Sequence, residues 1–186
     1  MDLEVEAAAV LAAAALQEDG KMKISRLFKH LLYPPWLVRR RFPPASLKKI
    51  EKAIQHSETR HSAEIRFAVE SSLSFIELLQ DTSCFDRGVD VFSELRVWDT
   101  ELNNGVLIYL LLADRTIEII VDRDVNKKVD SKERIRICRL MESLFRNKQF
   151  ETGVLKGIEE ITRLLITLYP ANAENINELP NKPVIL

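Results

Sequence analysis

Apolar residues recur three or four positions apart in several segments of the chain, which is the spacing of a helix with one buried face. This pattern predicts helices over residues 45–58, 84–97 and 131–147 and from Val154 to Leu168. Pro170 follows the last of them and ends it, because proline cannot continue a helix.

Other segments have strand patterns. In residues 64–70 apolar and charged side chains alternate, which predicts a half-buried strand. In residues 105–113 the odd and the even positions are both apolar, as in a strand covered on both faces. Residues 116–121 follow after only Asp114-Arg115, so the link is a hairpin turn and this pair is antiparallel. The order predicts a small α/β sandwich with a mixed central sheet and helices on both faces.

Composition divides the chain into an Ala-rich extension over residues 1–21, a basic-aromatic arm over 22–44, a domain over 45–170 and a tail over 171–186. The extension has very high helix propensity and changes abruptly into the arm, which suggests Met22 as an alternative natural start. The tail lacks periodicity and is predicted to be disordered.

Charge is uneven although the formal net charge is only −1. Residues 21–60 carry eleven Lys and Arg against two acids, and in the arm these cations alternate with aromatic and leucine side chains. Such a segment either lies on an anionic membrane surface or packs its apolar side chains on its own domain. An exposed basic linker is the simpler alternative, and no nucleic-acid partner is expected.

The lengths of the apolar runs and the pattern of cysteines indicate the cellular compartment. The run Ala7–Leu16 is too short to span a bilayer, and no other run is long enough. Cys84 and Cys138 form no paired pattern and are interpreted as reduced core thiols. We expect a cytoplasmic protein without a transmembrane segment, with peripheral binding at the inner membrane as a further expectation.

Common catalytic motifs are absent, including the glycine-rich phosphate loops, GxSxG and HExxH. His56 and His61 flank the turn between the first helix and strand, with Glu58 and Glu64 nearby. They are either acid–base or metal-binding residues or, more simply, partly exposed turn residues.

The segment "DRDVNKKVDSKE" over residues 122–133 has oxygen donors spaced as in a calcium-binding loop. These donors are Asp122, Asp124, Asn126, Asp130 and Glu133. Lys127 occupies the position where that loop needs glycine, and the segment follows a strand rather than a helix. The alternative is a polar loop in which Asp130 or Ser131 caps the next helix.

The stretch "WDTELNNG" lies before the strand at 105–113, at the same end of the hairpin. Asp99, Asn103 and Asn104 are predicted to add oxygen donors to the cation site. The alternative for Asn103, Asn104 and Gly105 is a turn with left-handed backbone, which asparagine tolerates and glycine prefers.

Residues 45–170 resemble the TPM domain family. The resemblance rests on "EIRFAVE", "VFSELRVWDTELNNGVLIYLLLADRTIEII" and "FRNKQFETGVLKGIEEI", including the NNGVL segment, the Asp114-Arg115 turn and the late glycines Gly153 and Gly157. It implies an α/β sandwich, divalent-cation binding by loop carboxylates, calcium in some members, and a weak acid phosphatase activity in plant members. Asp122-Arg123-Asp124 replaces the Gly-x-Gly of many relatives, and the chain resembles a soluble proteobacterial subgroup.

Two functions follow from these observations. The first is an interaction or quality-control module that binds calcium or magnesium through the loop carboxylates and has an unidentified protein partner. The alternative is a weak metal-dependent acid phosphatase in which Asp122, Asp124 and Asp99 hold the cation. An aspartyl-phosphate mechanism at Asp122 is disfavoured, because the later motifs of that class are not recognisable.

Overall fold

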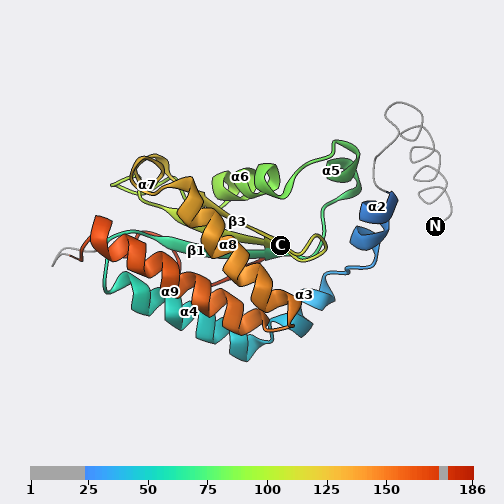
Figure 1. The fold of residues 1–186 in the computed structure, drawn as a ribbon, viewed down its shortest axis with the longest axis horizontal. Coiled ribbons are helices and arrows are strands. Elements are labelled where there is room, and N and C mark those ends of the chain that lie inside the picture. The colour runs from blue at the N-terminus through green and yellow to red at the C-terminus, as the bar shows by residue number, and fades with distance from the viewer. Residues whose placement is uncertain (1–23, 172–175) are drawn as a thin grey trace.

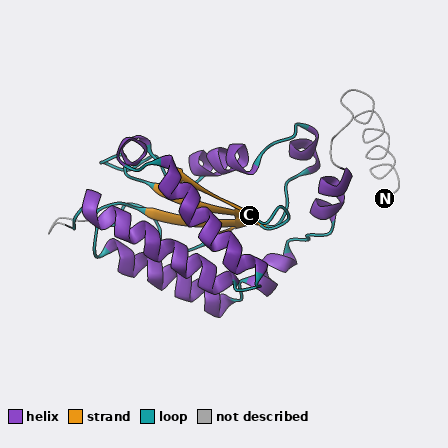
Figure 2. Cartoon of the chain, viewed as in Figure 1, coloured by secondary structure: helices purple, strands orange, loops and turns teal. Residues whose placement is uncertain are grey.

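A computed structural model describes residues 24–171 and 176–186, in which a mixed sheet lies between two helical layers (Figure 1, Figure 2). The strands of this part of the chain are β1 Ile65–Glu70, β2 Val106–Leu111, β3 Thr116–Val121 and β4 Val184–Ile185, in the order β3-β2-β1-β4. β1 is parallel to β2 and β4, and β2 is antiparallel to β3. The predicted α/β fold class is confirmed.

Three long helices cover one face of the sheet: α4 Pro44–Glu58, α8 Ser131–Arg146 and α9 Phe150–Leu168. α9 packs against both α4 and α8. Their apolar stripes meet the odd-numbered residues of β1 and the even-numbered residues of β2 in one core, which includes Ile54, Ile108, Met141 and Ile158.

The crossover from β1 to β2 covers the opposite face with α5 Phe75–Leu79 and α6 Cys84–Glu94. Val91 of α6 packs there with Leu107, Tyr109 and Ile120 in a second core. The two cysteines are free thiols, and each belongs to a different core, as expected for reduced core thiols. A parallel β1–β2 pair requires such a crossover.

The arm forms two short helices, α2 Ile24–Leu31 and α3 Trp36–Arg41. Val38 of α3 and the following Phe42 are fully buried in the first core. Residues 1–23, and with them the predicted extension and the first two residues of the arm, lie outside the described residues.

Predicted and observed boundaries agree where periodicity is strong, as for β3 and α8. The helix predicted over 84–97 ends at Glu94, because Arg96 adopts a left-handed φ of 53°. α9 begins at Phe150, one turn before the predicted Val154.

The predicted disorder of the tail is wrong for residues 176–186. β4 pairs with the edge of β1, and the backbone N–H groups of Glu178 and Leu179 each donate to the Glu64 carboxylate at 3.2 Å. Leu179 is buried in the second core. The order comes from pairing with an existing sheet edge, which needs no periodicity of its own.

Candidate functional site

The segment predicted as a cation-binding loop contains a short helix, α7 Arg123–Lys128, directly after β3. Asp122 caps this helix, because its Oδ1 accepts the backbone N–H of Arg123 at 2.6 Å. Lys127 and Lys128 in its last turn favour the helix through its dipole. Residues two positions apart lie about 200° apart around a helix. The alternating donors therefore do not converge as they would on a curved loop.

Several predicted donors are engaged elsewhere. The Asp124 carboxylate pairs with Lys128 Nζ at 2.6 Å and accepts the Tyr169 hydroxyl at 2.7 Å. Hydrogen bonds from Lys128 and Tyr169 lower the pKa of Asp124. The Asn126 amide oxygen accepts Arg134 Nη2 at 3.0 Å.

The remaining acids of the set have local structural roles. Asp130 caps α8 by accepting the backbone N–H of Lys132 at 2.9 Å, which is the alternative that the sequence left open. Glu133 pairs with Arg136 at 2.9 Å. Asp99 pairs with Arg96 at 2.6 Å.

Asn103, Asp122 and Asp124 are the predicted donors that the fold does bring close. The Asp124 backbone N–H donates to the Asn103 carbonyl at 3.2 Å, and Asp122 N–H donates to the Gly105 carbonyl at 2.9 Å. Asn103 and Asp124 line one hollow of about 280 Å³ together with Leu102 and two cations, Arg123 and Lys127.

Asp122 is only 4% exposed, and its Oδ2 has no hydrogen-bond partner among the described residues. Asp122 does not line the hollow, but it is next to Arg123 in sequence, and its buried oxygen could accept a cation. The other predicted donors suit a cation poorly. The Asp124 carboxylate already pairs with Lys128, and Arg123 donates to the Asn103 amide oxygen at 2.7 Å. In the described part of the chain, no three His, Cys, Asp or Glu side chains are grouped as metal ligands.

Asn104 has a structural role. It is fully buried, its backbone N–H donates to Thr100 Oγ1 at 3.1 Å, and its Nδ2 donates to the Ser62 carbonyl at 2.7 Å. Asn103 adopts the left-handed φ of 51° that the turn interpretation predicted. Gly105, by contrast, has no positive φ.

The turn between α4 and β1 is more buried than predicted. His56 is exposed, but His61 is fully buried and Glu58 and Glu64 are nearly so. Burial lowers the pKa of His61 to about 4 and raises the pKa of Glu58 to about 8. His61 Nε2 lies 2.8 Å from Ser57 Oγ, yet both side chains are closed off from solvent. This is a serine–histidine contact without access for a substrate.

The arm is attached to the hairpin turn through Asp114. Arg26 Nη2 contacts Asp114 Oδ2 at 2.9 Å, and His30 Nε2 contacts Oδ1 at 3.1 Å. Burial acts to raise the pKa of Asp114, but hydrogen bonds from His30 and Arg26 outweigh it and lower the pKa to about 2. His30 Nδ1 accepts the backbone N–H of Leu73 at 2.9 Å, so Nε2 carries the proton that faces Asp114.

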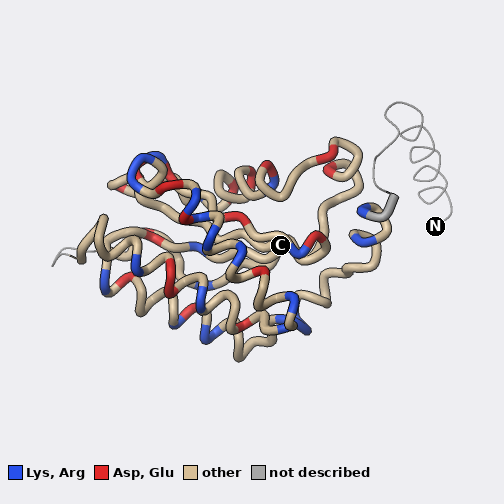
Figure 3. The backbone as a smooth tube through the Cα atoms, viewed as in Figure 1, with Lys and Arg blue, Asp and Glu red and all other residues tan. Residues whose placement is uncertain are grey.

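The outer side of the arm is apolar and exposed. We call Phe28, Leu31, Leu32 and Trp36 the arm patch; their exposed fractions are 59%, 69%, 74% and 59%. Exposed cations flank the patch, with Lys29 on α2 and Arg39 and Arg40 on α3, where basic residues gather (Figure 3). The sequence predicted that the arm either packs on its own domain or presents apolar side chains to a membrane. The structure has Val38 packed on the domain and the arm patch facing solvent.

Among the described helices, none has both the length and the apolar character needed to cross a bilayer.

The topology and the two covered faces of the sheet define a small mixed α/β sandwich. Residues 40–164 match the family model described as the TPM domain. The chain belongs to the TPM domain family, as the resemblance predicted. The arm patch lies ahead of the matched range.

Two solved structures are similar to this chain. BA42 protein from the psychrophilic bacterium Bizionia argentinensis is 31% identical with a TM-score of 0.68, over 76% of this chain and 93% of that one. The N-terminal domain of a protein from P. gingivalis is 16% identical with a TM-score of 0.56, over 70% of this chain and 82% of that one, and it shows the fold alone. Among curated proteins, none matches this sequence.

Proposed function

We propose that this TPM protein is a non-catalytic binding module whose arm patch docks on an anionic membrane surface at its cytoplasmic side. The observation that carries the proposal is the arm patch itself. Its four side chains are each more than half exposed, and exposed cations lie beside them. Large apolar patches of this kind are unusual on a free surface and mark interaction sites.

Charge and attachment favour a bilayer as the occupant. Each Lys or Arg near an anionic leaflet contributes about 1 kcal/mol, so Lys29, Arg39 and Arg40 complement such a surface. Arg26 and His30 hold α2 on Asp114, and Phe42 holds the end of α3 in the core. Because the arm is already positioned, docking orders little additional chain.

Vesicle flotation tests the proposal. The wild-type protein is expected to float with vesicles that contain phosphatidylglycerol and to remain below with phosphatidylcholine vesicles. Leu32→Ser with Trp36→Ser removes apolar area that inserts, so binding is expected to fall at least about tenfold, since each buried side chain is worth about 1.5 kcal/mol or more.

The matched control is Ile76→Ser with Phe85→Ser, which removes two apolar side chains that are 66% and 51% exposed elsewhere on the surface. The control is expected to float like wild type. An equal loss of vesicle binding in the arm variant and the control, or a wild-type protein that does not float, would contradict the membrane role. Self-association that only the arm variant abolishes would assign the patch to a second copy of the chain.

We propose divalent-cation binding as a second candidate, with calcium or magnesium held by Asp122 and Asp124 beside Asn103. It is favoured by the buried Asp122 Oδ2, which lacks a hydrogen-bond partner within the described residues. Because Lys128 Nζ lies 2.6 Å from Asp124, a cation there competes with this ammonium. Binding is therefore expected to be weak in the wild-type chain.

Thermal melting with about 1 mM calcium or magnesium measures this binding, because a ligand of the folded state raises Tm. We expect a small rise in Tm that Asp122→Asn abolishes and that Lys128→Gln enlarges. Asp90→Asn, which removes an exposed carboxylate from α6, is expected to keep the wild-type response. An unchanged Tm in both wild type and Lys128→Gln would contradict cation binding here.

The weak phosphatase alternative stays a prediction. Cation-dependent turnover of an aryl phosphate, abolished by Asp122→Asn and retained in Asp90→Asn, is the result that would support it.

A further inference from the structure

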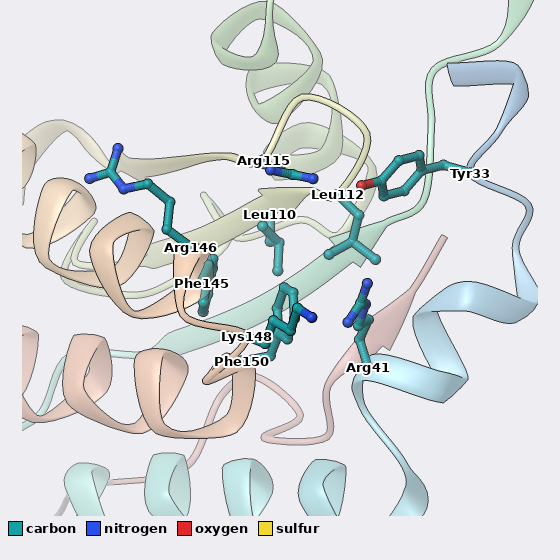
Figure 4. A pocket seen from close by; sticks show the side chains of 9 residues that line it. All are labelled: Tyr33, Arg41, Leu110, Leu112, Arg115, Phe145, Arg146, Lys148 and Phe150. Atoms are coloured by element: carbon teal, nitrogen blue, oxygen red, sulfur yellow. The ribbon is translucent and has the colours of Figure 1, made fainter. Parts of the chain in front are cut away.

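A cavity of about 110 Å³ opens where the arm, the hairpin turn and the α8–α9 junction meet (Figure 4). Its floor is apolar: Leu110 lies in β2, Leu112 directly follows β2, Phe145 lies in the last turn of α8 and Phe150 begins α9. The Phe145 and Phe150 rings stack with centroids 5.3 Å apart. The floor is thus a fixed aromatic and aliphatic surface.

Cations surround this floor. Arg41 of α3, Arg115 of the hairpin turn and Lys148 of the α8–α9 junction direct their side chains toward the cavity, whereas the Arg146 guanidinium points away in Figure 4. The lining includes no Asp or Glu. We call Arg41, Arg115 and Lys148 the cationic rim.

Among the described residues, no carboxylate pairs with any member of the rim. The acid next to Arg115 in sequence is Asp114, and both of its oxygens are taken by Arg26 and His30. Glu151, near Phe150, pairs with Lys49 at 2.7 Å and accepts Ser46 Oγ at 2.5 Å. Arg41 lies 4.9 Å above the Phe150 ring, which orients its guanidinium but does not neutralise it.

Two rim residues have an unfavourable backbone. Arg115 and Lys148 adopt left-handed φ values of 57° and 62°, a region that costs roughly 1 kcal/mol for a residue with a Cβ. Glycine or asparagine would satisfy both turns at lower cost. The chain instead has a long cation at each position, beside the same cavity.

We propose that this cavity binds a small organic anion, with an aromatic ring or short alkyl group on the Phe145–Phe150 floor and a carboxylate or phosphate against the cationic rim. At about 110 Å³ the cavity is smaller than the dry apolar cavity of about 150 Å³ that accepts benzene, so the ring rests on the floor and the anionic group lies at the opening, against the rim. Arginine recognises both carboxylate and phosphate by paired N–H donors. This inference is independent of the arm patch, whose side chains do not line the cavity.

Binding is measured on the full-length protein by amide chemical shifts with four probes that share one ring: benzoate, phenyl phosphate, benzyl alcohol and benzylamine. We expect saturable shifts around the cavity for one or both anions, with Kd at or below about 1 mM. Benzyl alcohol is expected to bind at least about tenfold more weakly and benzylamine not to bind. The two anions distinguish a carboxylate site from a phosphate site.

The rim is tested with Arg115→Asn plus Lys148→Asn, because asparagine tolerates the left-handed backbone. We expect this double variant to bind the anions at least about tenfold more weakly. Arg41→Gln, on a separate helix, is expected to weaken anion binding as well. Lys52→Gln plus Lys132→Gln removes the same charge outside the cavity and is expected to bind like wild type.

Three results would overturn the inference. The first is the absence of saturable shifts with either anion up to about 10 mM. The second is equal binding of benzyl alcohol and the anions. The third is equal loss of binding in the rim variants and the control, which would show a nonspecific charge effect.

Discussion

Gly105→Ala is expected to lower the free energy of unfolding by at least about 2 kcal/mol, because a side chain at this position has no space. A Cβ built on Gly105 lies 2.0 Å from the Val97 carbonyl oxygen and 3.0 Å from Val97 Cγ1. The obstacle is mainly backbone, so a rotamer change cannot relieve it.

The surrounding hydrogen bonds prevent the backbone from moving freely. The Gly105 carbonyl accepts the Asp122 N–H at 2.9 Å, and Val97 N–H donates to the Phe92 carbonyl at 3.0 Å. Moving either segment breaks contacts at the start of β2 or at the end of α6. The substitution is therefore expected to shift Asp122 and the start of α7 as well.

Urea denaturation measures the loss, and Gly88→Ala is the matched control. A Cβ at Gly88 lies 2.7 Å from Ile120 Cδ1, the end of a flexible side chain, and the helix gains about 1 kcal/mol from alanine. We expect the control to change stability little. Similar small effects in both variants would show that the Val97–Gly105 approach is looser than described.

Glu58→Gln is expected to remove much of the loss of stability that the wild-type protein undergoes between about pH 6.5 and 8. Glu58 is 6% exposed, and its Oε1 accepts the Ile65 N–H at 2.9 Å. Burial raises its pKa from 4.5 to about 8, and the Glu64 carboxylate adds to the rise. Glutamine keeps the hydrogen bond and cannot ionise.

The sign follows from the raised pKa in the folded state. The contribution of protonated Glu58 to stability is complete below about pH 4.5 and is lost as the pH rises through about 8. His61 acts in the opposite sense. Its pKa falls from 6.5 to about 4, so its contribution is present above about pH 6.5 and is lost as the pH falls through about 4. Above pH 6.5 the Glu58 effect is therefore free of the His61 effect.

Denaturant unfolding of wild type and Glu58→Gln at several pH values gives the difference in free energy of unfolding. This difference is expected to grow in favour of the glutamine variant by about 1 kcal/mol per pH unit between pH 6.5 and 8. Glu101→Gln, which removes an exposed carboxylate, serves as the matched control. A difference that does not vary with pH would rule out a raised pKa at Glu58.

Strong periodicity explains which elements could be predicted from sequence. β3 was predicted residue for residue, and α4 within one residue, because burial of one face imposes their spacing. α7 was missed because its polar residues also match a loop that binds a cation. Its signals were the cap at Asp122 and the lysines at its end. β4 was missed because two residues paired to an edge leave no periodic pattern.

The candidate sites show the same limit. The spacing along the chain predicted that Asp122, Asp124 and Asn126 share one cation. In the structure Asp122 caps α7, Asp124 contacts Lys128 and Tyr169, and Asn126 contacts Arg134. The cationic rim combines residues from α3, a hairpin turn and a helix junction, so no local pattern could reveal it. The arm could be recognised from sequence, because its basic and aromatic residues are neighbours along the chain. The sequence did not predict which of its side chains face solvent.

Fluorescence of Trp36 in a Trp98→Phe variant is the most direct test of the central claim that the arm patch docks on an anionic membrane. The chain has two tryptophans, so this variant reports on the patch alone. Phosphatidylglycerol vesicles are expected to shift the Trp36 emission to shorter wavelength, and brominated acyl chains are expected to quench it. Emission that stays at the free-protein wavelength and is not quenched, at vesicle concentrations where an amphipathic control peptide responds, would contradict the account.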